Sequence, residues 1–404
     1  MKAVVFHDVG DIRLDDVPEP TIKDATDAVI QVTASAICGT DLHFVRGTVR
    51  GMKPGTILGH EAVGIVADVG HAVHNLKSGD RVVVSSTIAC GNCSYCRQRS
   101  FAQCDCANPN GPRGGTACFG GPAAHGGFDG LQAEMARIPY ADVGLMKLPE
   151  HISDEQAILL SDIFPTGYFA AELAQVEPGD VVAVFGCGPV GQFAILSSFL
   201  MGAGRVLAID NVPDRLDIAR AQGAEVINFD SMDPVHALHE LTQGKGPDRV
   251  IDAVGVDAQS PQDDSSISLL EDEIAWIERQ RSQVCGEMPN NESRWKPGDA
   301  PMQALSWAVE GIAKAGTLAI VGVYPTPFES FPLGKAFDKN LTIKSGTCHH
   351  RRYIPKLIEM VAAGDVDPTL VMTRQECLVS ATEAYLSFDH REHGWLQVEL
   401  TPSS

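Results

Sequence analysis

Three side chains that are far apart in the sequence have the chemistry of a zinc site that stays open to substrate. They are Cys38, His60 and Asp162. A thiolate, an imidazole and a carboxylate are ordinary zinc ligands, and three protein ligands leave a fourth position for water or substrate. A zinc ion of this kind acts as a Lewis acid on a bound oxygen. Because a single Cys or His is more often a packed residue than a ligand, the prediction depends on what surrounds these three.

Two further polar residues follow Cys38 closely. Thr40 and His43 come two and five positions after it. A hydroxyl and an imidazole so near a metal ligand could relay a proton to solvent. The alternative is a turn or capping Thr and a surface His.

A second metal site is indicated by cysteine spacing. Cys90, Cys93 and Cys96 are separated by two residues each, and Cys104 follows after a short gap. Four thiolates on one loop can close a tetrahedral zinc site, which is shut to substrate and therefore braces the loop 90–104. Cys106 is a possible substitute ligand. The alternative is free thiols in a mobile loop.

A glycine-rich turn predicts a dinucleotide site. The apolar run 181–185 leads directly into Gly186, Gly188 and Gly191 and then into a helical stretch. In this strand–turn–helix context the glycines allow a tight turn and close approach of a pyrophosphate to the helix N-terminus. Asp210 ends the next strand and can accept hydrogen bonds from ribose hydroxyls, which favours NAD over NADP. An N-capping Asp is the alternative.

Composition excludes several classes of function. The chain has 404 residues, enough for two or three domains, and a net charge of −21 from 31 basic and 52 acidic residues. No basic patch is evident, so we expect no nucleic-acid partner and no anionic membrane partner. The N-terminus lacks signal-peptide architecture, and the longest apolar run is broken by Gly and Pro. Eleven cysteines without secretory context indicate metal ligands and a cytoplasmic location.

The elements that must position these residues change character along the chain. Residues 1–85 are β-rich, with short apolar runs between Gly, Pro and Asp, and a helix is expected around 153–160 with Ser153 as its N-cap. Strands and helices then alternate, which predicts a parallel, doubly wound α/β sheet of six strands. The expected strands are 181–185, 205–210, 224–229, 249–254, 317–323 and 341–344. The expected helices are 192–201, 214–222, 233–242, 302–315 and 353–363.

One segment does not fit this alternation. Residues 257–301 are acidic and polar, with one amphipathic piece around 269–279. A long insertion in a compact domain is usually functional or disordered. Its role cannot be read from the sequence.

With these motifs located, the chain resembles the zinc-containing medium-chain alcohol dehydrogenases over nearly its whole length. Asp162 stands where many members have a second Cys, which is similar to the branch of glutathione-independent formaldehyde dehydrogenases; the Gly-rich loop 105–130 and the insertion resemble that branch too. The resemblance rests on Cys38-Gly39-Thr40-Asp41, Gly59-His60-Glu61 with Gly64, the four-cysteine loop, Pro165-Thr166-Gly167-Tyr168, Gly186 to Gly191, and Asp210.

The resemblance implies a fold and a set of site residues. It implies a β-rich GroES-like catalytic domain over 1–163 and 351–404, and a Rossmann cofactor domain over 164–350. Cys38, His60 and Asp162 would hold catalytic zinc, with Glu61 beside the metal. Thr40 would bond the alcohol oxygen and pass its proton through the nicotinamide ribose towards His43. The implied cofactor-binding residues are Gly186, Gly188, Pro189, Val190, Gly191, Asp210, Arg215, Thr166, Val323 and Arg352, with Arg351 as the alternative to Arg352.

We therefore expect an enzyme with two zinc ions per subunit that transfers hydride between an alcohol or aldehyde hydrate and NAD. An aldehyde dismutase with captive NAD is one alternative, and a non-enzymatic zinc- and NAD-binding protein is another. A homo-oligomer, dimer or tetramer, would follow the family. The substrate is not readable from the sequence, and Phe44, Phe128 and Trp276 are only guesses at pocket-lining residues.

Overall fold

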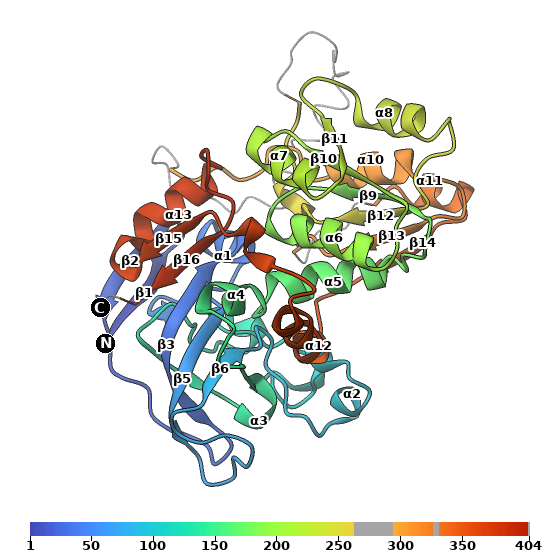
Figure 1. The fold of residues 1–404 in the computed structure, drawn as a ribbon. Coiled ribbons are helices and arrows are strands. Elements are labelled where there is room, and N and C mark those ends of the chain that lie inside the picture. The colour runs from blue at the N-terminus through green and yellow to red at the C-terminus, as the bar shows by residue number, and fades with distance from the viewer. Residues whose placement is uncertain (262–293, 326–330, 403–404) are drawn as a thin grey trace. The chain divides into compact units, whose positions relative to one another are not determined.

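The structure, a computed structural model, describes residues 1–261, 294–325 and 331–402 (Figure 1). These residues form two compact units. The first contains residues 1–165, 294–295 and 347–402, and the second contains residues 166–261, 296–325 and 331–346. The chain therefore returns to the first unit after Gly346.

The first unit is built on two β-sheets. A seven-stranded sheet has the order β15-β16-β3-β5-β6-β8, with β7 paired to β3 beside this path. The strand β16, close to the C-terminus, is antiparallel to β3, so the returning chain completes this sheet. The bounds are β3 (Ala28–Ile37), β5 (Ala62–Val69), β6 (Arg81–Val84), β7 (Met135–Ile138), β8 (Leu145–Lys147), β15 (Arg374–Cys377) and β16 (Val398–Thr401). The smaller sheet has the order β2-β1-β4, with β1 (Lys2–Asp8), β2 (Asp11–Asp16) and β4 (Thr56–Ile57).

Helices and 3-10 turns connect the strands of this unit. Helix α4 begins after Ser153 as predicted: the Ser153 hydroxyl accepts from the backbone N–H of Gln156, and the Gln156 side chain accepts from the Ser153 N–H. This reciprocal capping satisfies two N–H groups that a helix start leaves unpaired. The helices are α1 (Gly39–Val45), α2 (Ser94–Arg97), α3 (Ala141–Gly144), α4 (Asp154–Leu159), α12 (His350–Ala363) and α13 (Ala381–Asp389), and 3-10 turns are η1 (Phe101–Gln103), η2 (Gly111–Arg113), η3 (Ala123–His125), η5 (Pro368–Val371) and η6 (Leu378–Ser380).

The second unit contains the predicted parallel sheet. Its order is β11-β10-β9-β12-β13-β14, and every neighbouring pair is parallel. The order reverses between β9 and β12, which is where doubly wound sheets bind nucleotides. The strands are β9 (Val181–Phe185), β10 (Arg205–Asp210), β11 (Glu225–Asn228), β12 (Arg249–Asp252), β13 (Thr317–Ile320) and β14 (Thr342–Ser345).

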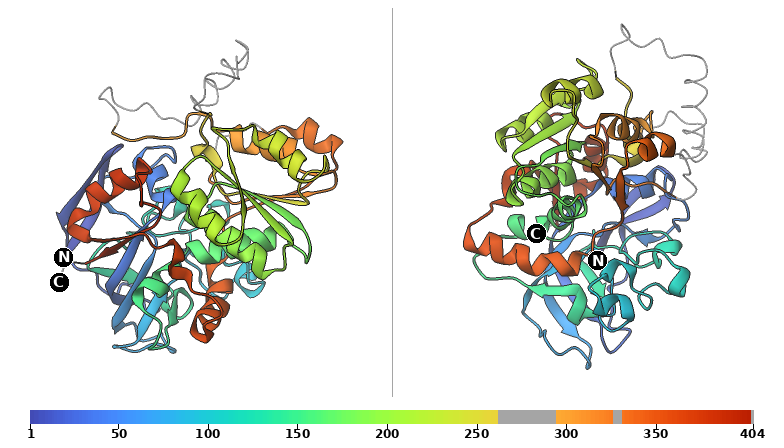
Figure 2. Two further views of the ribbon diagram at one scale, coloured as in Figure 1. Left: turned by 45° about the horizontal axis from the view of Figure 1, so that its top comes forward. Right: turned by 90° about the vertical axis from the view of Figure 1, so that its right-hand side faces the viewer.

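Helices cover both faces of this sheet, as Figure 2 shows. One apolar cluster joins α5, α6 and α7 to Val182, Val184 and Val206, while another joins α8 and α10 to Ala183 and Phe185. Successive residues of β9 thus point to opposite faces, and both faces are buried. The helices are α5 (Ile163–Leu173), α6 (Pro189–Leu200), α7 (Pro213–Ala221), α8 (Pro234–Leu241), α10 (Gln303–Gly311) and α11 (Leu333–Asp338), with a 3-10 turn η4 (Gly255–Asp257).

Several predicted boundaries were wrong because tertiary contacts overrode the local pattern. Helix α10 ends at Gly311 rather than at 315, because Ile312 is extended and Ala313 donates its N–H to Pro247. Strand β13 ends at Ile320 rather than at 323, because Val321 and Gly322 both donate their N–H groups to the carbonyl oxygen of Asp252, which ends the regular ladder.

Other boundaries begin earlier than predicted. Helix α6 starts at Pro189 rather than at 192, since Pro suits the first helical position. Helix α12 starts at His350 rather than at 353. Helix α5 was not predicted because it contains Pro and Gly; a Cβ on Gly167 would lie 2.5 Å from Phe193 Cβ, so this glycine permits close packing of α5 on α6.

The described ends of the insertion are held by specific contacts. Ser260 donates its backbone N–H to Asp299 Oδ1 at 2.8 Å, which ties the two ends together within the second unit. Trp295 belongs to the first unit, where its indole is 7% exposed and donates to the carbonyl oxygen of Gly10 at 3.0 Å. The helix expected around 269–279, and with it Trp276, lies outside the described residues.

Candidate active site

The structure brings together the residues predicted for the open zinc site. One ligand atom each from Cys38, His60, Glu61 and Asp162 lies within 4.8 Å of the others. All four residues are at most 8% exposed. Because a thiol, an imidazole and carboxylates converge in one buried place, the donor set suits zinc.

Local geometry places the first two of these residues. Cys38 follows β3 directly and is the N-cap of α1, where its backbone N–H donates to Asp41 Oδ2 at 3.0 Å. Gly59 precedes His60 with a φ of +87°, a conformation that favours glycine, and a Cβ there would also overlap Gln132. The turn at Gly59 thus brings the imidazole towards Cys38.

The imidazole of His60 is fixed at both ring nitrogens. Its Nδ1 lies 3.0 Å from Asp41 Oδ1, and its Nε2 lies 3.1 Å from Asp162 Oδ2. Asp41 is fully buried and was not predicted as a site residue. A carboxylate on Nδ1 sets the tautomer that leaves the Nε2 lone pair for a metal. Its signal in the sequence was its position three residues after Cys38, the pattern of a helix N-terminus.

Asp162 has two buried partners that sequence analysis also missed. Ser86 Oγ donates to its Oδ2 at 2.9 Å, and His350 Nε2 lies 3.0 Å from its Oδ1. Burial works to raise the pKa of Asp162, but His350 and His60 outweigh burial and hold this pKa well below its usual range. Asp162 is therefore held as a carboxylate.

The buried carboxyl group of Glu61 shows whether a cation would suit this cluster of ligand atoms. Its side chain is fully buried, and neither carboxylate oxygen has a hydrogen-bond partner among the residues described. Burial and the nearby Asp162 raise its pKa well above the usual range, and burial raises the pKa of Cys38 to about 11. Burying an unpaired carboxylate is costly, and a divalent ion would relieve the cost.

Helix α1 carries both members of the predicted proton relay. Thr40 and His43 are three residues apart on it and therefore on one face. His43 is 4% exposed, so the alternative of a surface His was wrong. Phe44 is 1% exposed and meets the ring of His125 edge-on, with 6.2 Å between ring centroids.

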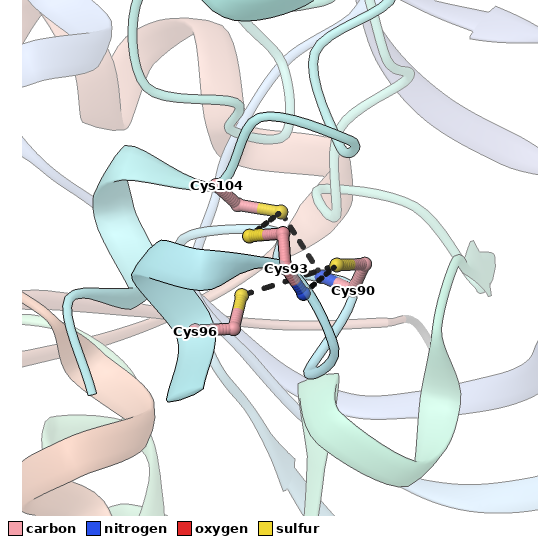
Figure 3. Close-up of side chains that lie close together, drawn as sticks. All are labelled: Cys90, Cys93, Cys96 and Cys104. Carbon is pink, nitrogen blue, oxygen red and sulfur yellow. Dashed lines mark hydrogen bonds between the residues drawn. The ribbon is translucent and has the colours of Figure 1, made fainter. Parts of the chain in front are cut away.

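The four-cysteine loop forms the second metal-ligand cluster, and Figure 3 shows its sulfur atoms converging. Cys90 Sγ lies 4.0 Å from Cys96 Sγ, and Cys93 Sγ lies 3.8 Å from Cys104 Sγ. Four sulfurs at about 2.3 Å from one tetrahedral ion are about 3.8 Å apart. The structure includes Cys104 in this cluster, while the alternative Cys106 is exposed.

Backbone N–H groups donate to Cys90 and favour the thiolate of Cys93, while burial raises the pKa of Cys96 and of Cys104. The N–H groups of Asn92 and Cys93 donate to Cys90 Sγ at 3.4 Å. For Cys93, burial acts to raise the pKa, but the backbone N–H groups of Cys96 and Asp105 outweigh it and lower the pKa to about 6. Thiolates are the form that binds zinc.

Replacing Cys96 with Ser should remove one zinc ion per chain and lower the Tm by about 5 °C or more, because the ion contributes to folding. Metal analysis and thermal unfolding measure both effects. The matched control is Cys377→Ser, which changes an exposed thiol at the end of β15 and should leave zinc content and Tm unchanged. Full zinc content in Cys96→Ser would contradict the assignment.

The glycine turn of the second unit has the backbone that a dinucleotide site requires. Gly186 follows β9 with a φ of +86°, and a Cβ on Gly191 would overlap the carbonyl oxygen of Gly186. Gly188 is the N-cap of α6, whose first residues are Pro189 and Val190. The N-terminus of α6 thus lies directly beyond the turn, where its N–H groups favour an anion.

Asp210 faces this turn. Its Oδ2 accepts from the backbone N–H of Cys187 at 2.7 Å, and its Oδ1 accepts from Asn211 and Val212 at 2.8 and 2.9 Å. It is not the N-cap of α7, which is Val212, so that alternative was wrong. The carboxylate retains acceptor capacity beyond these three bonds. On α7, Arg215 lies near Gly188, with Nη1 3.8 Å from where a Cβ on Gly188 would be.

A second aspartate, not predicted as a site residue, repeats this arrangement. Asp252 ends β12, is fully buried, and accepts from the N–H groups of Val254 and Gly255 and from the Tyr324 hydroxyl at 2.7 Å. Val323 precedes Tyr324, and its backbone is close to Gly255. The two halves of the sheet thus use the same device to shape the backbone after a strand.

The remaining predicted cofactor residues are divided between the two units. Thr166 lies on α5 in the second unit, and Arg351 and Arg352 lie on α12 in the first unit. Arg351 is half-buried, and burial lowers its pKa; Arg352 is exposed, with its guanidinium 5.2 Å from the centroid of the Tyr353 ring.

Known families match both parts of the chain. Residues 24–150 match the alcohol dehydrogenase GroES-like domain, and residues 189–268 match the zinc-binding dehydrogenase family. With the sheets of the two units, these matches confirm the predicted fold class of a GroES-like domain joined to a Rossmann sheet. No helix in the described part of the chain has the length and apolar character to cross a membrane.

Individual relatives extend these matches to the whole chain. An uncharacterized zinc-type alcohol dehydrogenase-like protein, AdhB, of Bacillus subtilis (strain 168) is 37% identical, and the alignment covers 100% of both chains. Glutathione-independent formaldehyde dehydrogenase of Pseudomonas aeruginosa (strain LESB58) is 36% identical over 64% of this chain and 66% of its own. The solved structure of alcohol dehydrogenase TADH from Thermus sp. ATN1 has a TM-score of 0.80 and 32% identity, covering 100% of both chains.

Proposed function

Because the chain belongs to the medium-chain, zinc-type alcohol dehydrogenase family, we propose that it is an NAD-dependent dehydrogenase that transfers hydride between an alcohol or aldehyde hydrate and NAD. The observation that carries the proposal is the buried convergence of Cys38, His60, Glu61 and Asp162. A zinc ion held there would supply Lewis acidity, which lowers the pKa of an alcohol bound to it.

Side chains of the first unit would accept the proton of the substrate hydroxyl and pass it on. Thr40 would hydrogen-bond the substrate hydroxyl and accept its proton for relay to His43, which lies three residues later on the same helix. Asp41 and Asp162 keep the His60 imidazole oriented. The Glu61 carboxyl group, which has no hydrogen-bond partner among the described residues, lies beside the ligand atoms and would balance the positive charge of a cation held there.

NAD is the proposed cofactor because Asp210 places a carboxylate beside the glycine turn. Replacing Asp210 with Asn keeps the side-chain size and removes the charge that would repel a 2′-phosphate. We expect the ratio of kcat/KM for NAD to that for NADP to fall by about tenfold to 100-fold, or ~1.4–2.7 kcal/mol. Steady-state kinetics with both cofactors measure the ratio.

Asp252→Asn is the matched control, since Asp252 shapes the corresponding backbone after β12. It should leave the cofactor ratio unchanged even if stability falls. An unchanged ratio in Asp210→Asn would contradict the assignment of NAD specificity to this carboxylate.

Within the family, we propose the formaldehyde dehydrogenase-like branch. Asp162 in the ligand set and the match to the Pseudomonas aeruginosa enzyme support this placement. Purified protein with two zinc ions per chain should form NADH, followed by its absorbance, from some member of a panel of alcohols and aldehydes. Absence of NADH from every member would contradict the dehydrogenase proposal.

The same preparation distinguishes the dismutase alternative. Captive NAD would appear as nucleotide released when the purified protein is denatured, and aldehyde alone would then yield alcohol and acid. A protein that releases no nucleotide is not a dismutase of this kind.

We also propose a homo-oligomer that uses the free edge of the parallel sheet. Strand β14 lies at one edge of this sheet, opposite β11, and Ile343 on it is 38% exposed. Helix α11, which precedes it, exposes Leu333 at 67% and Phe337 at 80%. An edge strand with exposed apolar neighbours is a template for pairing with another chain. The mass of the protein in solution tests this proposal, and a cytoplasmic location stays a prediction.

A further inference from the structure

His350 joins the metal-ligand cluster to the start of helix α12, and no role proposed above uses it. It is the first residue of the helix and is 2% exposed. Its Nε2 lies 3.0 Å from Asp162 Oδ1, and its Nδ1 lies 3.2 Å from Thr87 Oγ1. Both ring nitrogens therefore contact a buried side chain.

The two oxygens of Asp162 have different surroundings. Oδ2 accepts from Ser86 Oγ at 2.9 Å and lies 3.1 Å from His60 Nε2, the nitrogen that Asp41 leaves available for a metal. Two ligands at about 2.0–2.1 Å from one tetrahedral zinc ion are about 3.3 Å apart, close to this separation. Oδ1 instead faces His350. The geometry thus assigns Oδ2 to the ion and Oδ1 to the imidazole.

A carboxylate ligand needs such a partner more than a thiolate does. Cys38 offers a single sulfur, whereas Asp162 offers two oxygens that can bind a metal singly or together. A hydrogen bond to Oδ1 restrains rotation of the carboxylate and keeps this oxygen from the ion. The Thr87 hydroxyl can donate to Nδ1 of His350, which leaves the proton on Nε2, facing Asp162.

We propose that His350 is a positioning residue that holds Asp162 as a ligand through one oxygen and so keeps one coordination position open for substrate. This inference rests on the metal site of the proposed function. Outer contacts of this kind typically change metal affinity or activity by about tenfold to 100-fold when they are removed.

Four variants test whether His350 positions the Asp162 carboxylate or only fills space beside it. His350→Ala removes both contacts, and His350→Gln provides an amide N–H that can donate to Asp162 Oδ1 in place of the imidazole Nε2. Thr87→Val keeps the imidazole but removes the bond that sets its tautomer. His349→Ala is the matched control, because it removes a neighbouring imidazole whose Nδ1 accepts from the backbone of Ala102 at 3.3 Å.

Two measurements on the full chain report on the site without turnover. Competition with a chelator gives the affinity of the zinc ion held by Cys38, His60 and Asp162. Substitution with cobalt(II) gives an absorption spectrum whose intensity falls as the coordination number of the metal rises. His350→Ala should bind this zinc about tenfold to 100-fold more weakly and show a weaker cobalt spectrum. His350→Gln should recover most of the affinity, and His349→Ala should match the wild type.

Wild-type zinc affinity and an unchanged cobalt spectrum in His350→Ala would overturn the proposal, as would an equal loss in His349→Ala. If His350→Ala does not fold, Thr87→Val decides: weaker zinc binding supports the proposal, and wild-type binding overturns it. A chain that binds two zinc ions but oxidises no alcohol would contradict the proposed reaction. The zinc affinities of the wild type and the His350 variants would still test the proposal for His350, because they are measured without turnover.

Discussion

Replacing His60 with Ala should lower kcat/KM for alcohol oxidation by about 1,000-fold or more, which is ~4 kcal/mol of transition-state stabilisation. His60 is one of the residues whose ligand atoms lie within 4.8 Å of each other, and it lies between Asp41 and Asp162. Its loss removes a neutral ligand and leaves buried acidic groups without the imidazole between them. The zinc content should fall from two ions per chain to one.

The measurement combines metal analysis with steady-state NADH formation. His74→Ala is the matched control, because it removes an exposed imidazole from the same unit and should change neither quantity. The four-cysteine loop is a separate cluster, so the remaining zinc in His60→Ala should stay bound. Retention of two zinc ions and of activity in His60→Ala would contradict the proposed ligand set.

Replacing Gly191 with Ala should abolish nucleotide binding and lower the free energy of unfolding by about 3 kcal/mol or more. A Cβ at this position would overlap the carbonyl oxygen of Gly186, which is backbone and cannot move aside as a flexible side chain can. The turn between β9 and α6 would have to open. Denaturant unfolding and calorimetric titration with NAD measure the two effects.

Gly188→Ala is the matched control for the fold. Gly188 has an ordinary backbone conformation, with a φ of −66°, and the only atom near an added Cβ is Arg215 Nη1 at 3.8 Å. We expect little change in stability but weaker NAD binding, by about tenfold, because the methyl group stands where the pyrophosphate approaches. Equal NAD affinity in the wild type and Gly191→Ala would place the nucleotide elsewhere.

Motifs that are local in the sequence predicted most of the site. The glycine turn after β9 and the cysteine loop are defined by short spacings, and the structure shows both. The convergence of Cys38 and His60 with Asp162 was predicted through resemblance to a family, since no local pattern connects residues so distant in the chain.

Partners of the ligands could not be predicted because they depend on tertiary contacts. Ser86 and His350 meet Asp162 from segments 76 and 188 residues away in sequence. The sequence analysis included Asp41 in a motif but predicted no role for it, although its carboxylate contacts both Cys38 and His60. The ends of some helices and strands were mispredicted for the same reason, as at Gly322, whose N–H group donates to the carbonyl oxygen of Asp252 where the sequence would continue strand β13.

The most direct test of the metal-centred account is anomalous diffraction at the zinc absorption edge from crystals of the zinc-loaded protein. The account predicts two peaks per chain: one among Cys90, Cys93, Cys96 and Cys104, and one bounded by Cys38 Sγ, His60 Nε2 and Asp162 Oδ2. A single peak at the four cysteines, with none between Cys38 and Asp162, would contradict it.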